Sequence, residues 1–100
     1  MYFLPSADST PFNKLLVGTV SVDPPNILAG SMADVTETFN GVDVASSWMV
    51  FCSPQTDLTA NLGIASVRVS ADNQITVRFA NPTLLAINQG SVTMAVLAIK

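Results

Sequence analysis

The sequence of 100 residues has no histidine, one glutamate and one cysteine. Histidine is the commonest general base and a frequent zinc ligand, so its absence removes the usual catalytic triad and most zinc sites. The six aspartates stand beside different turn formers, where their side chains bond nearby backbone. We therefore expect a protein that is not an enzyme and that has no cofactor or metal. A scattered calcium site formed by Asp34, Glu37 and Asp43 is the remaining metal alternative.

Charge is scarce: only 11% of the residues are charged and the net charge is −3. The four basic residues form no run, which argues against nucleic acid and against an anionic membrane surface as partners. Apolar residues reach 49%, so few charges are left to coat the surface. Exposed apolar patches usually mark contacts with other chains, and we expect a homo-oligomer or a docking protein. A monomer with a surface rich in serine and threonine is the alternative.

Cys52 has no cysteine to pair with inside the chain, and it follows the apolar residues 48–51. This context favours a small buried hydrophobic residue over a reactive thiol. Residues 1–5 lack the basic start of a secretory signal, and no apolar run approaches the roughly 18 residues of a transmembrane helix. We expect synthesis and folding in a cytoplasm.

Short segments rich in valine and threonine alternate with turn formers, which favours an all-β sandwich or barrel. The segment 48–52 is apolar throughout, as is typical of a central strand, and 91–100 predicts a strand that is either central or at a subunit contact. Asn40-Gly41 favours a hairpin to 42–44. Residues 57–63 predict a helical turn or an irregular connection. Strands are also expected over 15–22, 31–39 and both arms of 64–79, and the aromatic residues Phe39, Trp48, Phe51 and Phe79 are expected in the core.

The segment 64–79 predicts a hairpin, because apolar and polar residues alternate on both sides of Asp72-Asn73. A loop of odd length, 72–74, would set Val69 opposite Val77 and therefore Arg68 opposite Arg78. Like charges at opposite positions are destabilising, so this register favours an acidic partner at the two arginines. Two solvated side chains that splay apart, or an aspartate of the chain between them, are the alternatives.

Residues 1–13 have a different composition, with Pro5 and Pro11 around a polar stretch. Proline favours extended backbone, so we expect an N-terminal arm. Its apolar start, Tyr2, Phe3 and Leu4, is a candidate contact with a neighbouring molecule. A frayed terminus is the alternative.

The segment Asn61-Leu62-Gly63-Ile64-Ala65-Ser66-Val67-Arg68-Val69-Ser70-Ala71-Asp72-Asn73-Gln74-Ile75-Thr76-Val77-Arg78-Phe79-Ala80-Asn81-Pro82-Thr83 resembles one that recurs in small virion proteins of tailed bacteriophages. These include proteins that decorate or cement capsids and modules of head or tail fibres. Met32-Ala33-Asp34-Val35-Thr36-Glu37-Thr38-Phe39 followed by Gly41-Val42 is similar in style, so the resemblance covers about 31–100. The shared pattern specifies strands and turns, and no functional residue is carried over from it.

The resemblance implies an all-β fold, a compact antiparallel β-sandwich that is jelly-roll-like. With the extended arm that composition predicts at 1–13, we expect this sandwich domain over 14–100. The resemblance also implies a homo-oligomer on the capsid surface of a virion, with a trimer expected first and a dimer next. The expected function is a capsid decoration or cement protein that binds the major capsid protein or another virion protein across subunits. The alternative is a receptor- or glycan-binding fibre module. The candidate partner-binding residues are Tyr2, Phe3, Leu4, Arg68 and Arg78.

Overall fold

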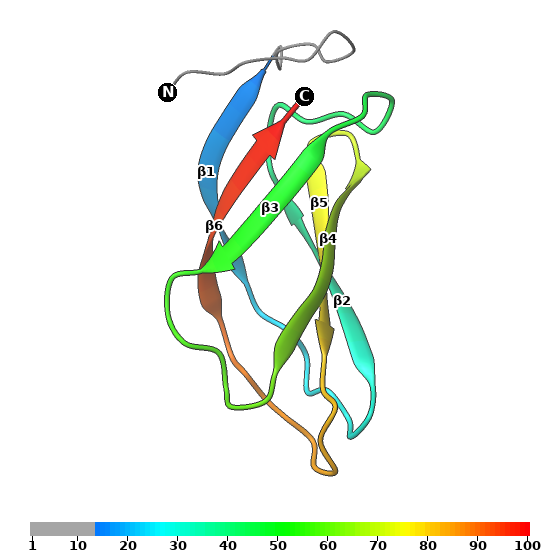
Figure 1. The fold of residues 1–100 in the computed structure, drawn as a ribbon, viewed down its shortest axis with the longest axis vertical. Helices are drawn as coiled ribbons and strands as arrows, with labels where there is room; N and C mark the ends of the chain where they lie inside the picture. The colour runs from blue at the N-terminus through cyan, green and yellow to red at the C-terminus, as the bar shows by residue number, and fades with distance from the viewer. Residues whose placement is uncertain (1–13) are drawn as a thin grey trace, which may run out of the picture.

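The computed structural model describes residues 14–100, which form six β-strands and no helix (Figure 1). The expected arm at 1–13, with Tyr2, Phe3 and Leu4, lies outside the described residues. The all-β class is confirmed. The strands are β1 (Leu15–Val22), β2 (Met32–Thr38), β3 (Met49–Pro54), β4 (Gly63–Ala71), β5 (Gln74–Ala80) and β6 (Val92–Ile99).

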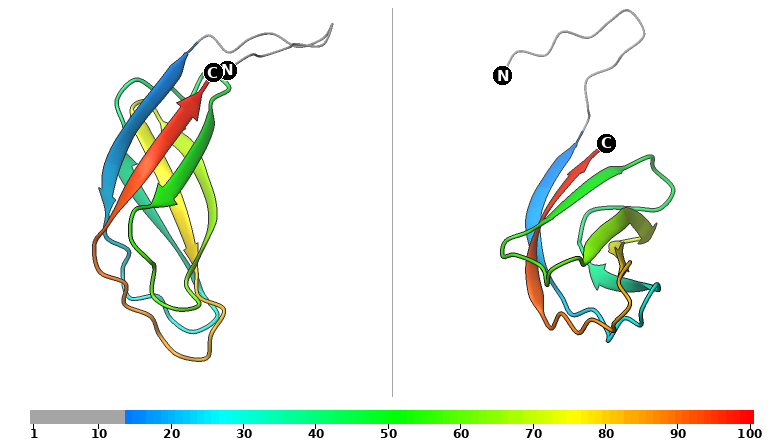
Figure 2. Two further views of the ribbon diagram at one scale, coloured as in Figure 1. Left: turned by 60° about the vertical axis from the view of Figure 1, so that its left-hand side comes forward. Right: turned by 60° about the horizontal axis from the view of Figure 1, so that its bottom comes forward.

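The strands form two antiparallel sheets of three strands, in the orders β1-β6-β3 and β2-β5-β4. Figure 2 shows the two sheets as layers, with β1, β6 and β3 in front in its left view. Side chains alternate between the two sides of each strand, and one side of each sheet meets the core. The fully buried core residues come from both sheets and from the connections between them, among them Val22, Ile27, Ile75, Val77, Phe79, Met94 and Val96.

One antiparallel ribbon runs through both sheets. The segment 15–38 lies beside 74–99 along its whole course, first as β1 with β6 and then as β2 with β5. Between the sheets the ribbon is held by a bridge in which the N–H groups of Ile27 and Ile87 donate to each other's carbonyls at 2.9 Å. The pairs along it are Leu15 with Ile99, Val22 with Val92, Ile27 with Ile87, Met32 with Ala80 and Thr38 with Gln74.

Asn81 fastens the two connections that carry this ribbon from one sheet to the other. Its side chain is 1% exposed, and its amide Nδ2 donates to the carbonyls of Ile27 at 2.9 Å, Leu28 at 3.3 Å and Leu85 at 2.8 Å. Its Oδ1 accepts from the N–H and the hydroxyl of Thr83. A buried amide with all these partners fixes both connections, because each lost bond would leave a polar group without water.

The prediction that the last strand is central is confirmed for β6, and β3 is therefore not the central strand. The strand predicted over 48–52 exists as β3, but it lies at the edge of its sheet because β6 occupies the centre. The prediction of a central strand covered on both faces is therefore wrong. Phe51, expected in the core, is 50% exposed on the outer side of β3, whereas Phe39 and Phe79 are buried as predicted.

The hairpin predicted at Asn40-Gly41 is also wrong, because β2 pairs with β5 and residues 42–44 form no strand. The segment after β2 instead wraps around the turn between β4 and β5. The Gly41 N–H donates to Asn73 Oδ1 at 2.9 Å, and the Val44 N–H donates to Asp72 Oδ1 at 3.0 Å. The Asn73 N–H donates to the Val42 carbonyl at 2.8 Å. The side chains of Asp72 and Asn73 thus hold the backbone of the segment 41–44.

The hairpin of β4 and β5 is confirmed, but its predicted register is wrong. The turn is the two residues Asp72 and Asn73, and irregularities in β4 absorb the odd residue. Asn73 has a φ of 59°, the left-handed conformation that asparagine tolerates. Val67, not Val69, lies opposite Val77. The apolar residues still share one face, because the shift is by two residues.

Candidate interaction surfaces

The outer side of the β1-β6-β3 sheet is apolar over most of its area. Register places its outward residues in rows across the three strands. The first two rows are Leu15, Ile99 and Met49, then Val17, Leu97 and Phe51. The next row is Thr19, Ala95 and Ser53. We call the six large residues of the first two rows, together with Ala95, the apolar face.

The apolar face is open to solvent and carries no charge. Val17 is 74% exposed, Met49 60% and Phe51 50%. A shallow groove of about 410 Å³ crosses it, lined by Val17, Phe51, Ser53, Ala95 and Leu97 with parts of Cys52 and Val96. The outward residues beyond the apolar face, Thr19, Ser21, Ser53 and Thr93, are polar but uncharged. The scarcity of charge predicts exposed apolar surface but does not locate it on particular strands.

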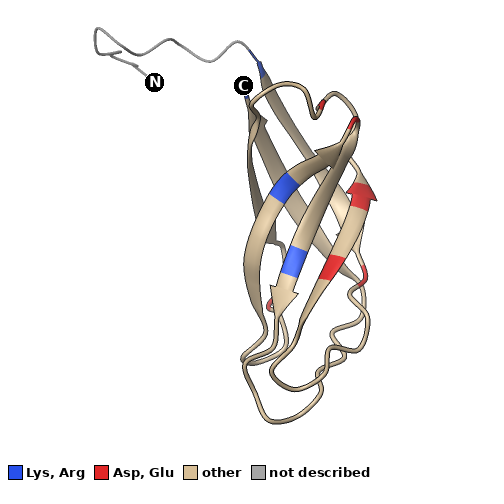
Figure 3. Cartoon of the chain, turned by 90° about the vertical axis from the view of Figure 1, so that its right-hand side faces the viewer, with Lys and Arg blue, Asp and Glu red and all other residues tan. Residues whose placement is uncertain are grey.

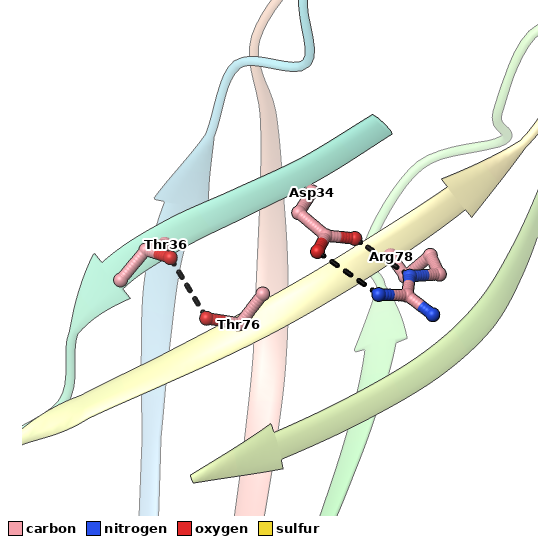
Figure 4. Close-up of polar contacts among 4 residues, drawn as sticks. All are labelled: Asp34, Thr36, Thr76 and Arg78. Carbon is pink, nitrogen blue, oxygen red and sulfur yellow. Dashed lines mark hydrogen bonds and ion pairs between the residues drawn. The ribbon is translucent and has the colours of Figure 1, made fainter. Parts of the chain in front are cut away.

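The outer side of the β2-β5-β4 sheet has the opposite chemistry. Figure 3 faces this sheet and shows basic and acidic positions on its strands. The Arg78 guanidinium donates from Nε to Asp34 Oδ1 at 2.8 Å and from Nη2 to Asp34 Oδ2 at 3.1 Å. One row away, the Thr36 and Thr76 hydroxyls share a hydrogen bond of 2.7 Å (Figure 4).

The register separates the two arginines that were predicted to lie opposite each other. Arg78 lies between Asp34 of β2 and Ser66 of β4, and Arg68 lies opposite Thr76. The predicted opposition of Arg68 and Arg78 is therefore wrong, because the turn is two residues long instead of three. Arg78 does have an aspartate of the chain as its partner, but Asp34 lies on β2 and not between the two arginines as the alternative expected. Among the described residues, Arg68 makes no ion pair.

The hydrogen bonds from Arg78 keep the pKa of Asp34 below its ordinary value. Desolvation opposes this effect, and the positive charges of Arg78 and then Arg68 add to it. We expect the substitution Arg78→Gln to raise the pKa of Asp34 towards its ordinary value, and Arg68→Gln to raise it less. A carbon-13 NMR titration of the Asp34 carboxyl in the three proteins measures this difference. An unchanged pKa in Arg78→Gln would show that the ion pair does not form in solution.

The same lowered pKa sets the sign of a pH effect on stability. An aspartate whose pKa is lower in the folded state stabilises the fold above its unfolded pKa and loses that contribution as pH falls through the folded pKa. The Asp34–Arg78 pair should therefore stabilise the protein at neutral pH. This contribution should decline as pH falls below the unfolded pKa of about 3.9 and end only below the lowered pKa of the folded state. Asp34→Asn removes this part of the pH dependence, and Thr38→Ala on the same face leaves it in place.

Two further acidic residues, Asp43 and Asp72, accept hydrogen bonds from the backbone of turns. Asp43 Oδ1 accepts the Ser46 N–H at 2.7 Å, and hydrogen bonds from Ser46 lower the pKa of Asp43. Asp43 and Asp72 thus confirm the expected turn role, whereas Asp34 lies within β2. Within residues 14–100, the structure brings no three potential ligands together in a metal site, and Asp34, Glu37 and Asp43 lie apart as ligands.

Cys52 lies on the inner side of β3, half-buried, with its Sγ 3.1 Å from the Met94 sulfur. Burial raises the pKa of the Cys52 thiol, so the reactive thiolate is disfavoured. This confirms the interpretation of Cys52 as a small hydrophobic residue.

A second hollow of about 390 Å³ lies between the edges of β3 and β4. Its lining includes Trp48, Ser46, Ser47, Val67 and Arg68. The Trp48 ring packs against the core and has the Lys100 Nζ 5.8 Å from its centre, and its indole N–H has no partner of good geometry among the described residues. The hollow therefore combines an aromatic ring, hydroxyls and one arginine.

The connection after Asn81 presents two leucines that the sequence analysis did not single out. Leu84 is 94% exposed and Leu85 77%, in a connection that the Asn81 amide holds in place. Their signal in the sequence is an apolar pair one residue after the turn former Asn81-Pro82.

Comparison of the chain with protein-family models, with curated proteins and with solved structures finds no match. Residues 14–100 also contain no helix of the length and hydropathy that a membrane span requires.

Proposed function

We propose that this chain is a non-enzymatic virion structural protein, a capsid decoration or cement protein that binds across capsid subunits and stabilises the shell. The observation that carries the proposal is the chemical contrast between its two outer faces. One is apolar and uncharged, and the other carries Arg68, Arg78 and Asp34. Two outer faces of different chemistry would let one chain contact other proteins on both sides within an assembly. Binding only the assembled shell would stabilise it by mass action.

The strand order supports the finer description as a jelly-roll-like β-sandwich. A long antiparallel ribbon folded over a core, with its ends in one sheet and its middle in the other, is the plan of a jelly roll, and 15–38 beside 74–99 follows it. The eight-strand jelly roll occurs in viral capsid and lectin domains. Residues 14–100 supply six strands, so an eight-strand plan would add one strand beside the edge of β3 and one beside the edge of β4.

The proposed contact with the shell is the β2-β5-β4 face. Arg68 is exposed there without an ion-pair partner among the described residues, and a guanidinium holds a carboxylate of a partner through two hydrogen bonds. Arg78 is already engaged by Asp34, so Arg68 should contribute more to binding. Residues 1–13, with Tyr2, Phe3 and Leu4, remain the second proposed contact.

Binding to empty capsids of the virus that encodes the chain tests this function. We expect the wild-type chain to sediment with the capsids and to raise their melting temperature. Arg68→Ala with Arg78→Ala should reduce occupancy at least tenfold, because charge-assisted bonds are lost, while the fold measured by circular dichroism persists. Thr38→Ala, on the same face, is the matched control. Absence of wild-type binding would overturn the proposed function, and unchanged occupancy of the double variant would overturn the role of the arginines.

A receptor- or glycan-binding fibre module is the second candidate, favoured by the hollow beside Trp48. Sugar sites combine an aromatic surface with a few polar groups, and this hollow offers Trp48, Ser46, Ser47 and Arg68. A chain that fails to bind capsids but binds defined glycans on an array, and loses them in Arg68→Ala, would replace the cement function with this one.

A further inference from the structure

We propose that the apolar face is covered by the same face of a second copy, so that the β1-β6-β3 sheets of two chains stack across a two-fold axis. The inference concerns a different surface from the proposed contact with the capsid. It holds whether or not the chain belongs to a virion.

The first step is that this face needs a cover. In a two-layer β protein the outer side of a sheet is ordinarily polar, and the β2-β5-β4 sheet follows that rule with Asp34, Arg78 and a pair of threonines. The β1-β6-β3 sheet breaks it over two complete rows of large apolar residues. Contiguous exposed apolar patches of this kind mark interaction sites.

The second step is that the chemistry of the face suits an identical partner. No outward residue of β1, β6 or β3 is charged, so stacking two copies brings no like charges together. A partner recognised by charge would have nothing to bind here. In a two-fold contact the same patch serves both chains, so it must be complementary to itself. An uncharged sheet face meets this condition, and the polar ends at Ser21 and Thr93 provide a rim.

The third step is shape. The groove on the face is lined along β6 by Leu97 and the small residue Ala95, and by the exposed side chains of Val17 on β1 and Phe51 on β3. Across a two-fold axis, the projecting side chains of each copy would face the groove of the other copy. Stacked sheets pack about 10 Å apart with strands about 30° from alignment, which lets such side chains interdigitate.

The size of the face predicts a reversible dimer. Three strands about 4.8 Å apart, of eight residues in β1 and β6 and six in β3, at about 3.3 Å per residue, give the outer side of the sheet a footprint of roughly 14 by 20 to 26 Å. This is below the roughly 800 Å² per partner of a standard stable interface. We therefore expect a dissociation constant in the micromolar range. The two-fold contact replaces the trimer expected from the resemblance.

Sedimentation equilibrium of the full chain from about 1 to 500 µM tests the proposal. We expect a monomer–dimer equilibrium in the wild type. Val17→Lys and Phe51→Lys should each raise the dissociation constant about 100-fold, because a lysine ammonium would lose water at the interface. Both positions are exposed in the single chain, so the lysines should not unfold it, which circular dichroism and thermal melting verify. Thr38→Lys is the matched control on the other sheet and should leave the constant within about threefold.

Three outcomes would overturn the proposal. A wild-type chain that stays monomeric at every concentration would assign the face to residues 1–13 or to another protein. A trimer or larger species would exclude the two-fold stack. A dimer that survives both lysine variants would place the interface elsewhere.

Discussion

Phe79→Ala is expected to lower the free energy of unfolding by about 3–5 kcal/mol. The Phe79 ring is 0% exposed in the middle strand of the β2-β5-β4 sheet, with Ala33 and Ile64 as its neighbours in register. Removing the ring loses its burial and leaves a cavity that a close-packed interior closes only in part. Domains of this size are stabilised by only about 5–15 kcal/mol, so the variant should be close to unfolding at room temperature.

Urea denaturation followed by fluorescence and circular dichroism measures this loss. Phe51→Ala is the control, since it removes the same ring from a half-exposed site on β3. At protein concentrations where the chain is a monomer, this variant should lose much less stability than Phe79→Ala. Equal losses in the two variants would contradict the assignment of Phe79 to the core and Phe51 to the surface.

Asn81→Asp is expected to destabilise the protein by about 3–5 kcal/mol at neutral pH, although it changes one atom. The amide nitrogen that donates to the carbonyls of Ile27, Leu28 and Leu85 becomes an oxygen that repels them. Burial also penalises the new charge, so the carboxyl should have a higher pKa in the folded state than in the unfolded chain. Such a shift destabilises the fold as pH rises above the unfolded pKa of about 3.9.

The pH dependence separates this effect from simple loss of packing. The difference in unfolding free energy between Asn81→Asp and the wild type should be large at pH 7 and should shrink towards pH 4. Asn26→Asp, an exposed site in one of the same connections, is the control and should change stability by less than about 0.5 kcal/mol. A small loss at pH 7 would show that the Asn81 amide does not hold the two connections.

Local patterns predicted the strands well because the alternation of side chains is a local property. The first strand, 15–22, has the predicted bounds, and β2 lies within one residue of its prediction. The order of strands depends on contacts between distant residues, which alternation does not encode. Residues 48–52 are apolar because Met49 and Phe51 belong to an uncovered face, a cause that a single sequence does not separate from burial in a central strand.

The candidate site was predicted in its chemistry more than in its geometry. The scarcity of charge indicated exposed apolar surface, but placing that surface required the register that joins β1, β6 and β3. The predicted opposition of Arg68 and Arg78 was wrong because the turn has two residues instead of three. Irregularities in β4 absorb the odd residue. The sequence indicated that Asn81 is a turn former. Only the folded chain shows that its side-chain amide donates hydrogen bonds to three carbonyls.

The ribbon of 15–38 with 74–99 also governs the order in which the chain can fold. Among the paired strands of residues 14–100, β4 and β5 alone follow each other directly in sequence, and their short turn can close early. Every other strand pair joins segments with at least one strand between them, up to Leu15 with Ile99. Closing those long loops costs conformational entropy before the contacts of the ribbon can form. The topology therefore favours slow folding that begins at the β4–β5 hairpin.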